Sequence, residues 1–389
     1  MRVVFISNIL TIHQEPFCEN MFKLLGNGFK FIAYNKKLKE TNESHKYASK
    51  EKDYFIQYEE NDYITTLIDN SDLVIIGSAP DKLIINRLKK KRITFKYSER
   101  LYRTELEQSK KKIIYNFFSS YLHHGRFQKY PYYMLCASAY TVLDVNMYGN
   151  YKNRCYKWGY FPETKFYDDI YRMKKNNKIE IVWGGRMIEL KHPELILGVA
   201  EYLAQKGYDF HINILGDGEL RKNIEKQFSE SSIIDKNQYK FIGKVDSIVM
   251  RQYMEGADIF LFTSDFREGW GAVLNEAMNS GCASIVSHAV GAAPYLIENH
   301  FNGLIFENMN SNDLIKKVEY LFENPKILRM LQKNAYYTIV DNWNAEIASK
   351  RIIELYKKIS LNQDTPFING ICSKAELIKN DWIRGYQGE

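Results

Sequence analysis

IFLFTSDFREGWGAVLNEAMNSGCASIV, residues 259–286, is the stretch of sequence that decides the fold. The apolar run 259–264 predicts a strand, and Gly269 and Gly271 predict a turn after it. In the run AVLNEAMNSG (272–281), apolar residues recur at helical spacing. A buried strand, a glycine-flanked turn and a helix together form the repeating unit of a parallel α/β sheet.

Two glutamates separated by seven residues, Glu268 and Glu276, indicate what this stretch binds. Glu268 lies at the mouth of the strand-to-helix turn, and Glu276 follows more than one turn into the helix. Small residues at such a turn let backbone N–H groups approach a diphosphate, and the helix N-terminus adds partial positive charge. Glu276 is able to accept two hydrogen bonds from a ribose diol, and Glu268 to bind sugar hydroxyls. The alternative is a solvent-facing pair of glutamates on an ordinary helix.

A second strand, IEIVWGG (179–185), ends in two glycines and is followed by two cations, Arg186 and Lys191. They bracket a short loop before a helix expected near Pro193, because proline is well tolerated in a first helical turn. Either cation alone would more often be a solvated surface charge. Facing the glutamate motif, the two form an anion site that stabilises the charge of a leaving diphosphate.

Strands and helices alternate through both halves of the chain, which predicts two Rossmann-like, doubly wound α/β domains. We expect an N-terminal domain over 1–165, a C-terminal domain over 166–345, and C-terminal helices over 346–389. The hinge is expected within 159–178, where hydrophobic periodicity is lost. Asn344 is the expected N-cap of a helix, AEIASKRIIELYKKI, and a further helix is expected over SKAELIKNDW (373–382).

Four segments between 178 and 325 resemble the C-terminal domain of family 4 glycosyltransferases, which have the GT-B fold and retain anomeric configuration. These segments read GGRMIELKHPELIL, INILGDGEL, YKFIGKV and EGWGAVLNEAMNSGCASIVSHAVGAAPYLIENHFNGLIF. The resemblance implies that Arg186 and Lys191 bind the donor diphosphate, Glu268 the donor sugar and Glu276 the nucleotide ribose. It also implies a terminal helix that crosses back to the first domain. In open α/β sheets ligands bind beyond the carboxyl ends of the strands, so we expect the active site in the cleft between the domains.

The expected site has a donor side and an acceptor side. The catalytic candidates are Arg186, Lys191 and Glu268, and the donor-binding candidates are Gly185, Arg186, Lys191, Gly243, Val245, Glu268, Gly269, Trp270, Gly271, Ala272 and Glu276. By elimination the acceptor is gripped by strand-end loops of the first domain, where His13, Glu99 and Arg100 are the candidates, although each singly would more often be structural. Many family members have a Gly-Gly pair and a histidine in this domain. This chain has Asn8–Ile9 and Gly77–Ser78 there, so those roles are not carried over.

Charge and cysteine content limit which partners and which cellular compartment are expected. Residues 1–165 hold 27 Lys and Arg against 17 Asp and Glu, and residues 82–129 hold 14 against 3. That basic region is either a contact for an anionic membrane surface or a solvated lysine-rich face. No nucleic-acid-binding module accompanies it, so nucleic acid is not an expected partner.

Five widely spaced cysteines favour a reducing cytoplasm over a disulfide framework or zinc site. The N-terminus reads as a strand rather than a signal peptide, and no apolar run approaches the roughly 20 residues of a membrane span.

The expected function is retaining transfer of a sugar from a nucleoside diphosphate donor, a UDP-sugar above others, to a hydroxyl of a glycan or lipid-linked acceptor. The N-terminal loops resemble those of bacterial enzymes that build surface polysaccharides, which implies a cytoplasmic enzyme, with peripheral attachment to the inner face of the membrane as an option. The chain has no DxD triplet, so neither a metal nor a cofactor besides the sugar nucleotide is expected. Three alternatives stay open: a UDP-sugar epimerase of the GT-B fold, a non-catalytic protein that binds or scaffolds glycans, and a membrane or nucleic-acid adaptor that works through the basic region.

Overall fold

The computed structural model describes residues 1–35, 52–101, 125–147, 149–174 and 178–385. The chain forms two compact units. The first contains Met1–Glu163 and Trp343–Lys379, and the second contains Thr164–Asn342 and Asn380–Glu389. Each unit has its own parallel sheet, so the predicted pair of doubly wound α/β domains is confirmed. Within the described ranges, no helix is long and apolar enough to cross a membrane.

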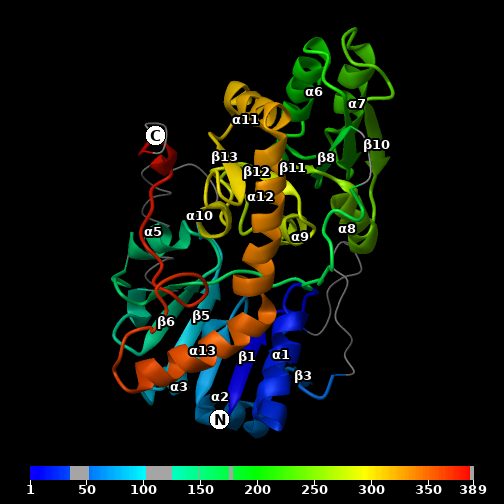
Figure 1. The fold of residues 1–389 in the computed structure, drawn as a ribbon. Helices are drawn as coiled ribbons and strands as arrows, with labels where there is room; N and C mark the ends of the chain where they lie inside the picture. Colours follow the sequence, from blue (N-terminus) through cyan, green and yellow to red (C-terminus); the bar gives the residue numbers. More distant parts are fainter. Residues whose placement is uncertain (36–51, 102–124, 148, 175–177, 386–389) are drawn as a thin grey trace. The chain divides into compact units, whose positions relative to one another are not determined.

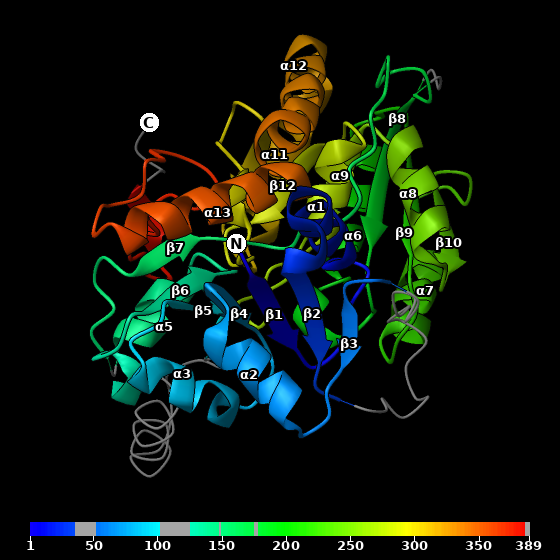
Figure 2. The same cartoon turned by 90° about the horizontal axis from the view of Figure 1, so that it is seen from below.

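The first unit, seen in Figure 1, contains a seven-stranded parallel sheet, and its strand order β3-β2-β1-β4-β5-β6-β7 can be followed in Figure 2. Its strands are β1 (Val3–Ser7), β2 (Phe29–Ala33), β3 (Phe55–Gln57), β4 (Leu73–Ile76), β5 (Thr94–Ser98), β6 (Tyr132–Cys136) and β7 (Cys155–Lys157). Its helices are α1 (Glu15–Leu25), α2 (Asp62–Asn70), α3 (Ile85–Lys89), α5 (Thr141–Asn146) and α13 (Ala345–Ser360). Because β1 and β4 are buried on both faces, their sequences VVFIS and LVII are almost entirely apolar.

The last long helix, α13, belongs to the first unit although it follows the whole second sheet in sequence. It packs against α1, and Figure 2 shows the two helices on one side of the sheet with α2 and α3 on the other. The predicted N-cap is confirmed, because the Asn344 side chain accepts a hydrogen bond from the Ile347 backbone N–H at 3.0 Å. The Ser349 hydroxyl also reaches the backbone carbonyl of Phe17 in α1, at 3.3 Å.

The helix expected over residues 373–382 does not form. Lys374 instead makes an antiparallel bridge with Tyr156, and its ammonium group bonds the backbone carbonyl of Asn153 at 2.6 Å. The preceding Ile371 and Cys372 are fully buried. These contacts extend the chain along the edge strand β7, and they outweigh a local helical pattern of only ten residues. A single 3₁₀ turn, Trp382–Gly385, follows in the second unit.

The second unit contains a six-stranded parallel sheet in the order β10-β9-β8-β11-β12-β13. Its strands are β8 (Ile179–Gly184), β9 (Phe210–Leu215), β10 (Tyr239–Gly243), β11 (Ile259–Phe262), β12 (Ala283–Ser287) and β13 (Gly303–Phe306). Its helices are α6 (Leu195–Gln205), α7 (Arg221–Glu230), α8 (Ser247–Gly256), α9 (Val273–Asn279), α10 (Ala293–Leu296), α11 (Ser311–Glu323) and α12 (Pro325–Tyr337). The strands predicted over 259–264 and 179–185 are present, each slightly shorter than expected.

In the second sheet the direction of strand progression reverses between β8 and β11, and this position is the topological switch point of the sheet. The chain leaves β8 toward β9 and β10, and it leaves β11 toward β12 and β13. Right-handed crossovers therefore carry α6 and α9 to opposite faces of the sheet, and the loops after β8 and β11 diverge. Such a divergence opens a crevice at the carboxyl ends of the strands, where ligands of doubly wound folds bind.

Candidate functional site

The loops after β8 and β11 carry the candidates predicted from sequence, and hydrogen bonds fasten the two loops together. The Trp183 indole N–H donates to the Thr263 hydroxyl at 2.9 Å, and that hydroxyl donates to the backbone carbonyl of Lys191 at 2.6 Å. The Asp265 backbone N–H also donates to the carbonyl of Leu190, at 3.0 Å. The backbones on both sides of the switch point are thus held in one arrangement before any ligand arrives.

Lys191 and Glu268 are brought together across this junction. The Lys191 ammonium group forms an ion pair with a Glu268 carboxylate oxygen, and both side chains are only about one-sixth exposed. The ammonium group also lies 5.5 Å from the centre of the Phe262 ring. Arg186 does not join this pair and has an exposed side chain. The structure therefore joins two of the three catalytic candidates and leaves the third at the surface of the same loop.

Glu276 lies in the middle of α9, where its side chain is partly buried. Burial raises the pKa of its carboxyl group, and the positive charge of Arg251 opposes this only in part. Arg251 is itself bonded to the side chain of Asn279. Among the described residues, no group donates a hydrogen bond to the Glu276 carboxylate. A largely desolvated acid without donors is costly, and the two hydroxyls of a ribose would satisfy it.

Two glycine positions show how closely the loops at the carboxyl ends approach each other. A Cβ on Gly216 would lie 1.8 Å from the backbone carbonyl oxygen of Gly185, so the loops after β8 and β9 touch through their backbones. Gly271 has φ +86°, and a Cβ there would lie 2.6 Å from the ring of Phe262. Side chains are thus kept out of the turn that leads into α9.

The Trp270 ring supports the turn rather than facing solvent. It is fully buried, and its indole N–H donates to the Asn275 side chain at 2.8 Å. Its neighbour Gly269 is also buried, so only Gly271 and Ala272 of this turn are partly open to solvent. Ala272 precedes α9 and has no side-chain oxygen to cap the first N–H groups of that helix. The Leu274 N–H is instead bonded to the backbone carbonyl of Gly271, at 2.9 Å.

The β10 candidates lie at the same edge of the sheet. Gly243 adopts φ +87°, and a Cβ there would lie 3.0 Å from a guanidinium nitrogen of Arg221. The Gly243 carbonyl accepts a hydrogen bond from the Gly216 N–H at 2.8 Å, which joins this strand end to the loop after β9. Val245 is partly buried and immediately precedes Asp246, the N-cap of α8.

A charged network beside the Lys191–Glu268 pair was missed by sequence reasoning. His192 adopts a left-handed φ of +48°, and its ring nitrogens contact Glu194 at 2.7 Å and Asp265 at 3.1 Å. Asp265 also binds the Arg267 guanidinium, which reaches Glu189 at 2.9 Å. The available signal was the order of charges itself, since DFRE follows one strand end and ELKHPE the other.

The network sets the charges of its members. Burial lowers the pKa of His192, but its hydrogen bonds to Asp265 and Glu194 outweigh burial and raise the pKa to about 9. Burial opposes ionisation of Asp265, yet bonds from His192 and Arg267 hold its pKa at about 2. His192 is therefore an imidazolium at neutral pH, and it clamps the loop after β8 to the loop after β11. Across the described ranges, no group of three or more His, Cys, Asp and Glu side chains is arranged to hold a metal ion.

The acceptor-side candidates all lie in the first unit and have different surroundings. His13 follows β1 and lines a small aromatic recess with Phe5, Phe17 and Tyr97. Arg100 follows β5 and is only 7% exposed, with its guanidinium 3.7 Å from Asp144 and stacked over Tyr140 at 5.0 Å. Glu99 is partly buried, and its backbone carbonyl accepts a hydrogen bond from Ser98. His13 thus follows one strand of the first sheet, whereas Glu99 and Arg100 follow another.

The basic region 82–129 contains cations of two kinds. Arg87 is fully buried and donates hydrogen bonds to four backbone carbonyls and the Thr94 hydroxyl. Burial and the nearby Arg92 lower the pKa of Arg87 to about 10. Lys89 and Lys91 are exposed. The lysine run 110–112 and Tyr121 lie outside the described residues.

Comparison with known proteins agrees with this architecture. Residues 170–338 match the family described as glycosyl transferases group 1. Superposition on a crystal structure of HepE from Anabaena in complex with UDP gives a TM-score of 0.65 over 91% of this chain and 99% of that one, at 13% identity. The chain has the GT-B fold. The fold and the family match together support a glycosyltransferase of this fold.

Two relatives of known sequence each match a little less than half of this chain. An uncharacterized glycosyltransferase of Haemophilus influenzae is 26% identical over 176 residues, which is 45% of this chain and 47% of that protein. A poly(ribitol-phosphate) alpha-N-acetylglucosaminyltransferase of Staphylococcus aureus is 25% identical over 48% of this chain and 37% of that protein. The chain thus spans about half the length, or less, of these relatives.

Proposed function

We propose that this protein is a retaining, family 4 glycosyltransferase that transfers the sugar of a UDP-sugar to a hydroxyl of a glycan or lipid-linked acceptor. The reaction would serve the synthesis of a cell-surface polysaccharide. The observation that carries the proposal is the meeting of Lys191 and Glu268 at the switch point of the second sheet, with the partly buried Glu276 on the adjoining helix. The bound UDP of the HepE structure supports the choice of nucleotide. The name of the staphylococcal relative supports the class of acceptor.

In the absence of a donor, Lys191 and Glu268 neutralise each other. A diphosphate carries more negative charge than one carboxylate, so it competes for the Lys191 ammonium group and releases Glu268. The released carboxylate then accepts hydrogen bonds from sugar hydroxyls. Arg186 is exposed on the same loop and is free to approach the diphosphate, whose charge grows as the bond to the anomeric carbon breaks.

In the proposed reaction, the bond between the anomeric carbon and the diphosphate oxygen breaks, and a bond from the acceptor hydroxyl oxygen forms on the same face of the sugar. The proton of that hydroxyl passes to an oxygen of the leaving diphosphate. Lys191 and Arg186 lower the energy of the departing anion, and Glu276 holds the ribose so that the diphosphate stays against the turn at Gly271. Assistance by the leaving group requires no enzymic nucleophile and no metal.

A panel of nucleotide sugars tests the donor side directly. The melting temperature of the full chain is measured with each compound, and a ligand at about 100 times its Kd stabilises by about 2.7 kcal/mol. We expect UDP and at least one UDP-sugar to raise the melting temperature, and Glu276→Ala to abolish the effect. Glu354→Ala, on the exposed face of α13, is the matched control.

Product analysis then separates transfer from the competing reactions. Incubation with the donor and an acceptor should give a glycoside with the anomeric configuration of the donor. Conversion of the donor to an epimer without any acceptor would contradict the proposal, as would full UDP binding by the Glu276→Ala variant.

A further inference from the structure

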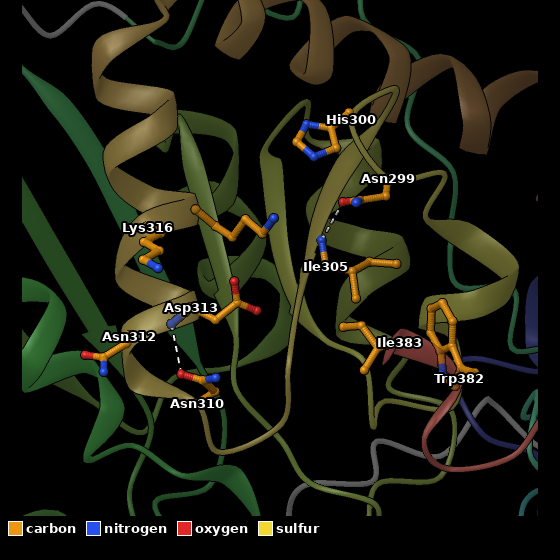
Figure 3. Close-up of a pocket in the computed structure, with 10 residues that line it drawn as sticks. Asn299, His300, Ile305, Asn310, Asn312, Asp313, Lys316, Trp382 and Ile383 are labelled. Carbon is orange, nitrogen blue, oxygen red and sulfur yellow. Dashed lines mark hydrogen bonds between the residues drawn. The ribbon is translucent and has the colours of Figure 1, made fainter. Parts of the chain in front are cut away.

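A cavity that none of the donor-side candidates lines lies along β13, the edge strand of the second sheet. Its volume is about 700 Å³. Figure 3 shows that side chains from three segments line it: the loop and strand that hold Asn299, His300 and Ile305, the start of α11, and the C-terminal turn that holds Trp382 and Ile383. The lining residues all belong to the second unit. The cavity is large enough for a short oligosaccharide.

Positive charge dominates the side chains of the α11 wall. Lys316 and Lys317 both line the cavity, and neither forms an ion pair with any residue that the structure describes. The only carboxylate in the lining, Asp313, is already engaged, since it accepts a hydrogen bond from the Glu307 backbone N–H at 2.8 Å. Burial and the nearby Lys317 lower the pKa of His300, which is thus neutral at pH 7. The cavity is therefore lined by two cations and one carboxylate, and that carboxylate is already bonded to the Glu307 backbone N–H.

The other walls combine an aromatic ring with amides and aliphatic carbon. Trp382 is partly exposed, and Ile305 and Ile383 lie beside it (Figure 3). Asn312 contributes an exposed amide group at the start of α11, whereas the Asn310 amide is already bonded to the Glu307 carboxylate and the Asp313 N–H. An indole face packs against the C–H face of a pyranose, and asparagine side chains donate to and accept from hydroxyls. This mixture suits a sugar chain better than a purely ionic or a purely apolar ligand.

A chain of aromatic contacts connects this cavity with the donor-side loop. The His288 ring lies 6.2 Å from Trp382 on one side and 5.3 Å from Phe266 on the other, between ring centres. The His288 Nδ1 accepts from the Asn308 N–H at 2.8 Å, so its Nε2 carries the proton and donates to the Asn380 carbonyl at 3.0 Å. Phe266 is two residues from Glu268. The wall of the cavity is therefore fastened to the loop that carries the candidate catalytic glutamate.

We propose that this cavity binds an acidic segment of the acceptor glycan, with a sugar ring against Trp382 and a carboxylate or phosphate group at Lys316 and Lys317. The inference rests on the proposed glycosyltransferase function and narrows its acceptor to an acidic saccharide chain. Binding away from the reacting hydroxyl holds a long acceptor on the enzyme between successive transfers, because the second contact raises the effective concentration of the chain at the active site.

Intrinsic fluorescence offers a local readout of this binding. Of the five tryptophans, Trp158, Trp183, Trp270 and Trp343 are buried, and Trp382 alone is partly exposed. The full chain is titrated with tetragalacturonate, with the neutral tetrasaccharide maltotetraose, and with inorganic phosphate. We expect a saturable change in emission with tetragalacturonate, binding of maltotetraose weaker by about tenfold, and loss of the signal in Trp382→Phe.

Charge variants test the α11 wall. The double variant Lys316→Gln/Lys317→Gln should bind tetragalacturonate about tenfold more weakly, and added salt should weaken the parent more than the variant. The control Lys326→Gln/Lys333→Gln removes the same charge from exposed positions of α12 outside the cavity and should bind like the parent. Equal affinity for the acidic and neutral tetrasaccharides, or an unchanged affinity in the Lys316/Lys317 variant, would overturn the proposal.

Two further outcomes are decisive. If inorganic phosphate binds as tightly as tetragalacturonate, the cavity is an anion site without saccharide recognition, and the proposal fails. If no probe binds, it fails as well. UDP binding is measured in parallel by thermal shift: UDP binding without saccharide binding refutes only the acceptor inference, whereas saccharide binding without UDP binding refutes the proposed transfer reaction.

Discussion

The ammonium group of Lys191 and the carboxylate of Glu268 form an ion pair although 77 residues separate them in the sequence. Each residue lies in the loop that follows its own strand, and the strands β8 and β11 are neighbours. Both side chains are mostly shielded from water, so removing either one leaves a charge with little solvent to stabilise it. Without a ligand, the ion pair stabilises the arrangement of the two loops. A bound donor would have to displace it.

Variants of this ion pair are expected to show that its effect on thermal stability is distinct from its effect on catalytic activity. Lys191→Ala should reduce kcat about 10²-fold and weaken UDP binding, because the growing charge of the diphosphate loses its cation. The reciprocal exchange Lys191→Glu/Glu268→Lys should recover much of the lost melting temperature without recovering kcat. Steady-state kinetics and thermal melts measure both effects, with Lys206→Ala on the exposed end of α6 as the control. Restored activity in the exchanged variant would show that the pair is structural only.

Glu276→Gln should stabilise the unliganded protein while it weakens donor binding. Burial raises the pKa of Glu276 above its unfolded value, so the ionised form opposes folding at neutral pH, and an uncharged amide removes this opposition. The melting temperature at pH 7 should rise, and the difference from the parent should shrink as the pH falls below about 4, where the parent carboxyl group is protonated in both states. UDP affinity, measured by calorimetry, should fall. A variant that is less stable at pH 7 would contradict the argument.

The His192 network predicts a pH window for stability. The folded pKa of about 9 exceeds the ordinary value of 6.5, so the contribution of His192 is complete below about pH 6.5 and is lost as the pH rises toward 9. The depressed pKa of Asp265, about 2, gives a contribution that is present above about pH 4 and lost as the pH falls toward 2. Chemical denaturation of His192→Asn and of the parent should therefore differ most between pH 4 and 6.5. His211→Asn, on β9, serves as the control.

Sequence patterns predicted the architecture well because the central strands of both sheets are buried on two faces and read as apolar runs. The placement of the donor-side candidates was also predictable, since glycines, cations and glutamates follow strand ends that the fold must bring to one edge. The ion pair between Lys191 and Glu268 could not be predicted. A sequence pattern shows which residues lie at the same edge of a sheet, but it does not show which side chains contact each other. The left-handed backbone of His192 and the buried carbonyl cluster around Arg87 depend on contacts between distant segments, and no local signal marks them.

In the region 373–382, the sequence pattern predicted a helix that the structure does not contain. Its spacing favours a helix, yet the bridge between Lys374 and Tyr156 and the burial of Cys372 hold the chain extended. Ten residues of helical pattern carry little intrinsic stability in water, so a few tertiary contacts decide the outcome.

Backbone contact at Gly216 should make that position intolerant of any side chain. Gly216→Ala places a Cβ 1.8 Å from the Gly185 carbonyl oxygen, so one of the two loops must move, and we expect a loss of at least about 3 kcal/mol in the free energy of unfolding. Gly207→Ala is the matched control: it also has a positive φ, but no atom lies within 4 Å of the added Cβ, so the loss should be about 1 kcal/mol. Urea denaturation measures both, and equal losses would show that backbone strain, not the contact, decides.

Arg87 should behave as a core residue despite its place in a lysine-rich run. Arg87→Ala removes the donor to four backbone carbonyls and should lower the free energy of unfolding by about 3 kcal/mol or more. Lys89→Ala, in the same helix but exposed, should change it by less than about 0.5 kcal/mol. A mild effect of Arg87→Ala would contradict the buried assignment.

The return of α13 to the first unit decides how this protein can be divided. A polypeptide that stops at Glu163 lacks the helix that covers α1, so its apolar flank would be left facing water and would favour aggregation. The stretch Thr164–Asn342 is continuous and holds its whole sheet, which makes it the fragment to express for nucleotide-binding studies. Recovery of the first unit in isolation calls for a rearranged gene in which the segment from Trp343 to Lys379 is joined behind Glu163.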